Sequence, residues 1–376
     1  MPGLPLPAGV RSRQLPGVNG LDLHLLEAGF ETPGRPCVLL LHGFPELAYS
    51  WRRVLPALAA AGYHAVAPDQ RGYGRTAGGH AAYDGDIGAY RMPALAADMR
   101  ALVQALGRDA VQAVVGHDFG SPVAAWCALL WPQVFRSVVL MSAPWAGPPS
   151  RLPPSPQAAL QALVPPRQHY QWYYATRQAD ADMRHCPQGL HAFLRAYYHH
   201  KSADWPHNRP HPLASGSAEQ LARMPTYYIM ALGTDMAATV APHMPTAEAI
   251  AACAWLPDAE LAVYAAEYQR TGFQGGLQWY RCAIDEDCQR ELLTHAGRTI
   301  DVPALYIAGA QDWGTYQKPG AFEAIPVRAC TQWRGSHLVP GAGHWVQQEQ
   351  PRAVNALLLR FLDDVVRADR HAPAAG

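Results

Sequence analysis

The 376-residue sequence contains little lysine, no excess of either charge and no long apolar run. Lys+Arg and Asp+Glu each number 30, and this balance argues against nucleic acid or an anionic membrane surface as the main partner. The only lysines are Lys201 and Lys318, so catalysis through a lysine Schiff base is not expected. No stretch reaches the roughly 18 apolar residues of a membrane-spanning helix.

Cysteine motifs and a secretion signal are also missing. The seven cysteines are an odd number scattered between Cys37 and Cys330, and they form neither a CxxC motif nor a disulfide framework. The continuous apolar stretch of a signal peptide is not found in the first segment, MPGLPLPAGVRSRQLPG. We therefore expect a cytoplasmic protein with reduced cysteines, and its 49% hydrophobic residues can build a large core.

Apolar runs alternate with helical patterns in the first 146 residues and again near the C-terminus. The expected strands are residues 37–41, 64–67, 111–115, 137–141, 303–308 and 331–333. The expected helices are residues 52–61, 92–106, 121–130 and 351–366. Strands that alternate with helices form right-handed βαβ units, so the sequence predicts an α/β fold with a mostly parallel twisted sheet flanked by helices.

The alternation of strands and helices stops in the middle of the chain. From about residue 147 to residue 298 the sequence is rich in Tyr, Trp, His, Pro and Met, and its patterns are helical. One α/β core with an inserted helical lid explains the length better than two tandem domains, because the two core pieces complete one sheet. We therefore predict core segments at 1–146 and 299–376 and a lid at 147–298.

An aspartate stands where a strand is expected to turn sharply into a helix. Gly116 and Gly120 flank Asp118 at two residues on either side, which permits a turn that presents its side chain at the carboxyl end of the sheet. Most enzymes with this turn carry serine, but a carboxylate is already ionised at neutral pH and can displace a leaving group from an sp3 carbon. Asp118 is the candidate nucleophile, and the alternative is a simple cap of the next helix.

A nucleophile of this kind needs a histidine that activates water and an acid that orients this histidine. His344 lies in a glycine-rich loop before the terminal helix, and Asp312 follows the expected strand at 303–308. The order Asp118, Asp312, His344 matches the nucleophile–acid–histidine order of the α/β-hydrolase arrangement. The segment SAPWAGPP after the preceding strand has no carboxylate, so Asp312 is the expected acid.

The turn HGFPE at residues 42–46 follows the expected strand at 37–41. The backbone N–H of Phe44 can point at the nucleophile, and with the N–H of Phe119 it would bind the oxyanion that develops during ester hydrolysis. We also expect a cis peptide bond before Pro45, which would fix the turn.

Several segments resemble the soluble, aspartate-nucleophile epoxide hydrolases of the α/β-hydrolase fold: HGFPE, SWRRVLPALAAAGY, APDQRGYG, GHDFG and GAGHW, in the family's order from about residue 20 onward. The resemblance implies conversion of an epoxide and water to a vicinal diol through an ester on Asp118, hydrolysed by water that His344 and Asp312 activate. It also implies two lid tyrosines that activate the epoxide oxygen, Tyr170 in HYQWY and Tyr280 in GGLQWYR. A phenol suits this proton donation better than a carboxylic acid.

Competing functions fit the residues less well. Haloalkane-type dehalogenases, which would use the same triad, generally carry tryptophan after the nucleophile, and fluoroacetate dehalogenases carry arginines near it. Here Phe119 offers no side-chain donor, and no arginine follows until Arg136. Many epoxide hydrolases also have tryptophan at the Phe119 position, so the chain departs there from the family. An esterase based on Ser121 would lack the elbow position, and a non-catalytic protein would lack a triad residue.

Aromatic residues near these motifs suggest a pocket wall. We expect Trp172, Trp279, Trp345 and Tyr173 to bind substrate. The histidines at residues 199–211 lack a metal-ligand spacing, so neither a metal nor an organic cofactor is expected. The expected partners are a small apolar epoxide and water, and the sequence leaves the oligomeric state open, with a homodimer among the options.

Overall fold

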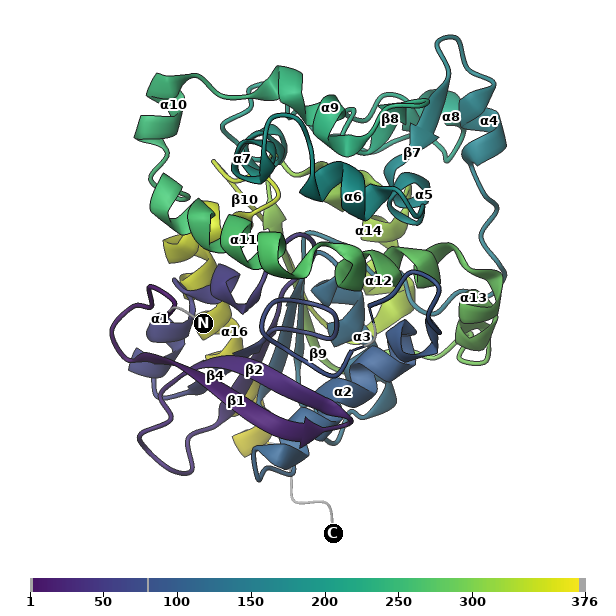
Figure 1. Cartoon of the computed structure of the whole chain (residues 1–376). Helices are drawn as coiled ribbons and strands as arrows, with labels where there is room; N and C mark the ends of the chain where they lie inside the picture. Colours follow the sequence, from purple (N-terminus) through teal and green to yellow (C-terminus); the bar gives the residue numbers. More distant parts are fainter. Residues whose placement is uncertain (1–2, 80, 372–376) are drawn as a thin grey trace.

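An eight-stranded sheet forms the centre of the computed structural model, which describes residues 3–79 and 81–371 (Figure 1). Its strand order is β1-β2-β4-β3-β5-β6-β9-β10. The strands are β1 (Val10–Val18), β2 (Leu21–Ala28), β3 (Cys37–Leu41), β4 (His64–Pro68), β5 (Ala113–His117), β6 (Val138–Met141), β9 (Ile300–Gly309) and β10 (Cys330–Val339). From β4 to β10 the neighbours run parallel, which confirms the predicted mostly parallel sheet.

The antiparallel pair β1–β2 at one edge of the sheet was not predicted. β2 pairs antiparallel with both β1 and β4. β1 is largely exposed and contains Pro16 and Gly17, so it lacks the apolar run that marks a buried strand. The edge strand β10 is also exposed along much of its length, and for this reason the prediction at 331–333 covered only a short part of it. β5 also begins at Ala113 and continues to His117, two residues later than predicted at each end.

Helices cover both faces of the sheet. α2 (Met92–Ala105) and α3 (Gly120–Leu130) pack together, and α3 contacts β5 and β6, while α1 (Leu55–Ala60) contacts α16 (Pro351–His371). α1 is shorter than the predicted helix at 52–61 and has a proline in its first turn. Short helices α14 (Ala321–Ala324) and α15 (Val346–Glu349) lie in the loops after β9 and β10. The result is the three-layered arrangement expected of an α/β core.

The chain between β6 and β9 forms a mainly helical insertion, seen above the sheet in Figure 1. Its helices are α4 (Gln157–Gln161), α5 (Tyr170–Tyr174), α6 (Ala179–Arg184), α7 (Leu190–Lys201), α8 (Ala218–Leu221), α9 (Met236–Val240), α10 (Ala247–Ala252), α11 (Asp258–Thr271), α12 (Gln274–Ile284) and α13 (Glu286–Leu293). Two short strands, β7 (Arg167–His169) and β8 (Ile229–Ala231), pair antiparallel within it. The boundaries 1–146, 147–298 and 299–376 stay a prediction, and residues 1–2 and 372–376 lie outside the described part.

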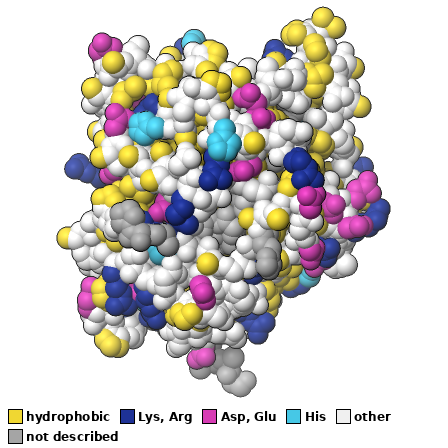
Figure 2. Space-filling view, in the orientation of Figure 1, with side chains coloured by type: hydrophobic (Ala, Val, Ile, Leu, Met, Phe, Trp, Pro, Cys, Tyr) yellow, Lys and Arg dark blue, Asp and Glu magenta, His cyan; other side chains and the backbone are white. Residues whose placement is uncertain are grey.

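The surface agrees with the balanced composition. Figure 2 shows basic and acidic side chains interspersed over one face of the molecule, without a patch of a single sign. Among the residues that the structure describes, no helix is both long and apolar enough to cross a membrane.

Candidate active site

Asp118 lies at a strained turn between β5 and α3. Its φ of +52° is in the left-handed region, which non-glycine residues rarely adopt. A Cβ at Gly116 would collide with the carbonyl oxygen of Gly120, and a Cβ at Gly120 would collide with that of Leu41. Both glycines are therefore required by close backbone approach, which is why this local sequence can form the turn.

Two groups from distant parts of the chain hold the Asp118 carboxylate. The Phe44 N–H donates to Oδ1 at 2.9 Å, and His344 Nε2 lies 3.1 Å from Oδ2. The expected cis peptide bond joins Phe44 to Pro45. The Phe119 N–H has no hydrogen-bond acceptor among the described residues. The carboxylate therefore faces the binding partners of a nucleophile, and its side chain does not cap α3.

His344 stands between two carboxylates. Its Nδ1 lies 3.0 Å from Asp312 Oδ1, and the same oxygen accepts the Gly314 N–H at 2.7 Å. Burial alone would raise the pKa of Asp312, but the charge and hydrogen bond of His344 outweigh it, so the pKa is lowered. Asp312 is therefore ionised at neutral pH and can orient the imidazole ring.

Electrostatics also keep Asp118 ionised. Burial by itself would raise the pKa of this carboxyl. The hydrogen bond and charge of His344 act in the opposite direction, and the charges of Lys201 and His117 add to them. These effects hold the pKa of Asp118 well below its usual range, so the group is ready to act as a nucleophile at neutral pH.

A buried ion pair supports the turn and the histidine loop from below. His117 Nδ1 lies 2.6 Å from Glu46 Oε2, and His117 Nε2 lies 2.6 Å from the carbonyl oxygen of His344. Glu46 Oε1 also accepts the side-chain N–H groups of Gln347 and Gln348. Burial favours neutral forms, but the mutual attraction raises the pKa of His117 and lowers that of Glu46. This network ties residues 42–46 to the loop that carries His344.

The inserted helices hold the histidine loop from the other side. The His344 N–H donates to the carbonyl oxygen of Lys201 at 2.9 Å. Glu349 Oε2 accepts the Ala203 N–H at 2.8 Å and the Gly343 N–H at 2.9 Å, while its Oε1 accepts the Trp345 N–H at 2.9 Å. The position of the candidate base thus depends on both the core and the insertion.

Tyr170 and Tyr280 come together although they lie on different helices, α5 and α12. Their ring centroids are 5.8 Å apart, and both side chains are buried. The Tyr280 ring lies edge-on to Phe44 at 5.4 Å and to Phe119 at 4.8 Å. Burial, with a contribution from the nearby Asp118 charge, raises the pKa of both phenols well above 10. Both groups are therefore neutral hydrogen-bond donors near Asp118.

Tyr174 also belongs to this aromatic cluster, and it was missed. Its ring centroid lies 4.9 Å from that of Tyr280 and 5.5 Å from that of Tyr170. Helical spacing could have found it, because residues four apart share one face of a helix. The Tyr173 hydroxyl instead donates to Asp182 of α6 at 3.2 Å.

The three tryptophans expected to bind substrate have different surroundings. Trp279 is fully buried against Phe119 and donates to the carbonyl oxygen of Arg71. Trp345 is fully buried against His344, and the half-buried Trp172 packs on His169. Trp279 and Trp345 thus pack against two site residues, Phe119 and His344. A substrate contact by any of these tryptophans, or by Tyr173, stays a prediction.

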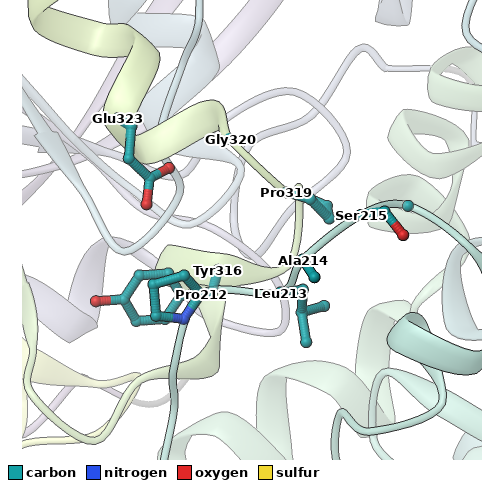
Figure 3. A pocket seen from close by; sticks show the side chains of 9 residues that line it. Pro212, Leu213, Ala214, Ser215, Tyr316, Pro319, Gly320 and Glu323 are labelled. Carbon is teal, nitrogen blue, oxygen red and sulfur yellow. The ribbon is translucent and has the colours of Figure 1, made fainter.

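A pocket of about 370 Å³ lies near the loop that follows Asp312 (Figure 3). It is lined by residues 212–216 of the insertion and by Tyr316, Pro319, Gly320 and Glu323. The same loop carries Gln317, whose Oε1 accepts the Tyr170 hydroxyl at 3.2 Å. Within the described ranges, no group of three or more His, Cys, Asp or Glu side chains is arranged to hold a metal ion.

Comparison with known proteins identifies the family. The sequence model of the α/β hydrolase fold family matches residues 36–351. Epoxide hydrolase A of Mycobacterium tuberculosis is 37% identical over 360 residues, which cover 94% of this chain and 98% of that protein. An epoxide hydrolase from an endophytic Streptomyces is 35% identical and superposes with a TM-score of 0.77, covering 96% of this chain and 97% of its own.

A third relative gives the same result. Epoxide hydrolase A from Mycobacterium thermoresistibile is 35% identical, with a TM-score of 0.73, and the match covers 94% of this chain and 98% of that chain. The chain belongs to the epoxide hydrolases of the α/β-hydrolase fold, as its motifs predicted.

Proposed function

We propose that the protein converts an epoxide and water to a vicinal diol through a covalent ester on Asp118. One observation carries the proposal: an ionised, buried carboxylate lies beside two neutral buried phenols and within 3.1 Å of an acid-oriented histidine. Hydrolysis of an epoxide through an enzyme ester requires these groups, namely a nucleophile, donors for the epoxide oxygen and a base for water.

In the first stage, an Asp118 carboxylate oxygen attacks one epoxide carbon and the ring C–O bond breaks. Tyr170 and Tyr280 donate hydrogen bonds to the epoxide oxygen, and one of them supplies its proton. Their raised pKa values support this role, because a phenol that stays neutral keeps its proton until the alkoxide develops.

In the second stage, His344 removes a proton from a water molecule that attacks the ester carbonyl carbon. Asp312 orients the ring and stabilises the imidazolium form. The N–H groups of Phe44 and Phe119 bind the developing oxyanion, a role supported by the 2.9 Å Phe44 contact and by the free N–H of Phe119. The diol then leaves and the carboxylate is restored.

The substrate class follows from the surroundings of the two phenols. The rings of Phe44, Phe119 and Tyr174 surround Tyr280, so the site favours a small apolar epoxide. The inserted helices carry both tyrosines, and we assign residues 147–298 as the lid that covers this substrate.

The test is diol formation from styrene-type, aliphatic and bulky epoxides by the purified protein. We expect turnover of at least one class and none by Asp118→Asn, since an amide is a poor nucleophile. Halide release from haloalkanes without diol formation from any epoxide would instead support a dehalogenase and reject the proposal.

A further inference from the structure

Lys201 is a buried cation beside the candidate active site. It is the last residue of α7 and only 3% exposed, whereas Lys318, the other lysine of the chain, is exposed. Its carbonyl oxygen accepts the backbone N–H of His344 at 2.9 Å. The backbone of Lys201 is therefore held against the candidate base.

Four aromatic rings form a cage around the ammonium group of Lys201. Its Nζ lies 5.0 Å from the ring centroid of Tyr228, 5.4 Å from those of Tyr197 and Trp345, and 5.7 Å from that of Tyr227. Within the described part of the chain, no carboxylate forms an ion pair with this group and no acceptor hydrogen-bonds to it. The charge is thus stabilised by ring faces, and no single anion neutralises it.

The cage also touches the reacting groups. The Trp345 ring packs on His344 at 4.7 Å, and the Tyr228 ring packs on Tyr170 at 5.2 Å. The Tyr197 hydroxyl accepts a hydrogen bond from Tyr174, whose ring contacts Tyr280. One aromatic ring therefore separates the ammonium from His344 and from Tyr170, and two rings separate it from Tyr280.

A cation in this place needs an explanation beyond packing. Burying an ammonium without a paired carboxylate is unfavourable, and an apolar side chain of similar length would fill an aromatic cage at lower cost. Lys201 binds the backbone of His344, whose ring lies between the triad carboxylates Asp118 and Asp312, and the Lys201 charge already helps to lower the pKa of Asp118. Its field therefore acts on the group whose charge changes during the reaction.

We propose that Lys201 is an electrostatic positioning residue that acts through Asp118 and speeds hydrolysis of the enzyme ester. The inference rests on the proposed epoxide hydrolysis. Asp118 is anionic in the free enzyme, neutral as the ester, and anionic again in the tetrahedral oxyanion. A fixed positive charge lowers the free energy of the two anionic states relative to the neutral ester.

The proton and electron balance makes the two half-reactions differ. In alkylation, the Asp118 oxygen bonds to carbon as the epoxide C–O bond breaks, and charge moves onto the epoxide oxygen, which takes a tyrosine proton. In hydrolysis, water adds to the ester carbon, His344 takes its proton, and charge appears on the carbonyl oxygen. Collapse breaks the ester bond, the diol oxygen takes the His344 proton, and the remaining carboxyl proton returns to the tyrosine.

In alkylation, negative charge moves from Asp118 to the nearby epoxide oxygen, so the Lys201 charge should change the alkylation rate little. In hydrolysis, negative charge appears on the ester carbonyl oxygen of Asp118, so the Lys201 charge should raise the hydrolysis rate more. For Lys201→Met we expect hydrolysis to slow by about tenfold and alkylation to change by less than about threefold. For Lys201→Arg, which keeps the charge, we expect both rates to stay near those of the wild type. Lys318→Met is the matched control and should behave as the wild type.

The experiment is rapid-quench kinetics with styrene oxide, read by intact-protein mass spectrometry, which counts the ester-bearing fraction at each time. A larger steady-state ester fraction in Lys201→Met, restored by Lys201→Arg, supports the inference. An unchanged ratio of the two rates, or equal slowing of both, overturns it. If the melting temperature shows that Lys201→Met does not fold, Lys201→Gln replaces it, and the same slowing of hydrolysis with little change in alkylation is expected.

Failure of the proposed function gives a different result. In that case neither diol nor ester would form in the wild type or in Lys318→Met, and no comparison of half-reactions could be made. Diol formation by the wild type with an unchanged rate ratio in Lys201→Met rejects only the role of Lys201.

Discussion

The substitution Asp312→Asn separates the charge of the acid from its role in orienting the histidine. Asp312 Oδ1 is shared by His344 Nδ1 at 3.0 Å and by the Gly314 N–H at 2.7 Å, while Oδ2 is buried without a hydrogen-bond partner among the described residues. Because the Gly314 N–H can only donate, the amide oxygen of asparagine should keep the Oδ1 position. His344 then keeps its tautomer and loses only a negative neighbour.

The size of the effect follows from this geometry. A carboxylate about 4 Å from an imidazolium contributes about 4 kcal/mol at an effective dielectric constant near 20, equivalent to roughly a thousandfold in rate. We therefore expect ester hydrolysis to slow by about 10³-fold, less than the roughly 10⁴-fold loss seen where the tautomer is wrong. The amide nitrogen would be buried without an acceptor, which should lower the free energy of unfolding by about 1–3 kcal/mol.

The assay is a single turnover with excess enzyme, quenched in acid and analysed for ester and diol. Alkylation should proceed at nearly the wild-type rate, while the ester persists. Asp301→Asn, at the opposite end of β9 and exposed, is the matched control. Equal slowing of alkylation and hydrolysis would refute the reasoning, as would a hydrolysis rate that the substitution leaves unchanged.

Three further predictions follow from the same site. His344→Gln should still alkylate but not turn over, so a stable ester mass should appear, and normal turnover would reject His344 as the base. Tyr280→Phe should slow alkylation by about 10- to 100-fold because Tyr170 remains as a donor, measured by single-turnover quench; an unchanged rate would remove Tyr280 from the mechanism. The alkylation rate should stay flat from about pH 5 to pH 9, because the pKa of Asp118 is held low and the tyrosine pKa values are raised; a stopped-flow profile with an inflection in this window would contradict these shifts.

The strands that could be predicted from the sequence are those whose side chains are buried on both faces of the sheet. β3 and β4 are buried at every position, so each reads as an apolar run between turns. The edge strands β1 and β10 are exposed along much of their length, and their pairing depends on neighbours that are distant in sequence. Periodicity carries little information about such strands.

The candidate site divides in the same way. Asp118, Asp312 and His344 stand in short motifs whose local geometry needs glycine, so the sequence could indicate them. The Glu46–His117 pair and the cage around Lys201 join residues from separate elements, and no spacing within one segment signals them. Tyr174 was not predicted as a site residue, although its four-residue spacing from Tyr170 places both on one face of α5.

The hydrogen bond from the His344 N–H to the carbonyl oxygen of Lys201 means that the inserted helices help to hold the candidate base. The acceptor is a backbone carbonyl, so any amino acid at this position can supply it, and the link can persist through side-chain divergence. An exchange of lids between relatives would therefore replace a support of the candidate base together with part of the proposed pocket wall. A chimera of this kind should keep the backbone conformation of residues 201–203 and the hydrogen bond from the Ala203 N–H to Glu349. The residues that contact substrate can be chosen after that.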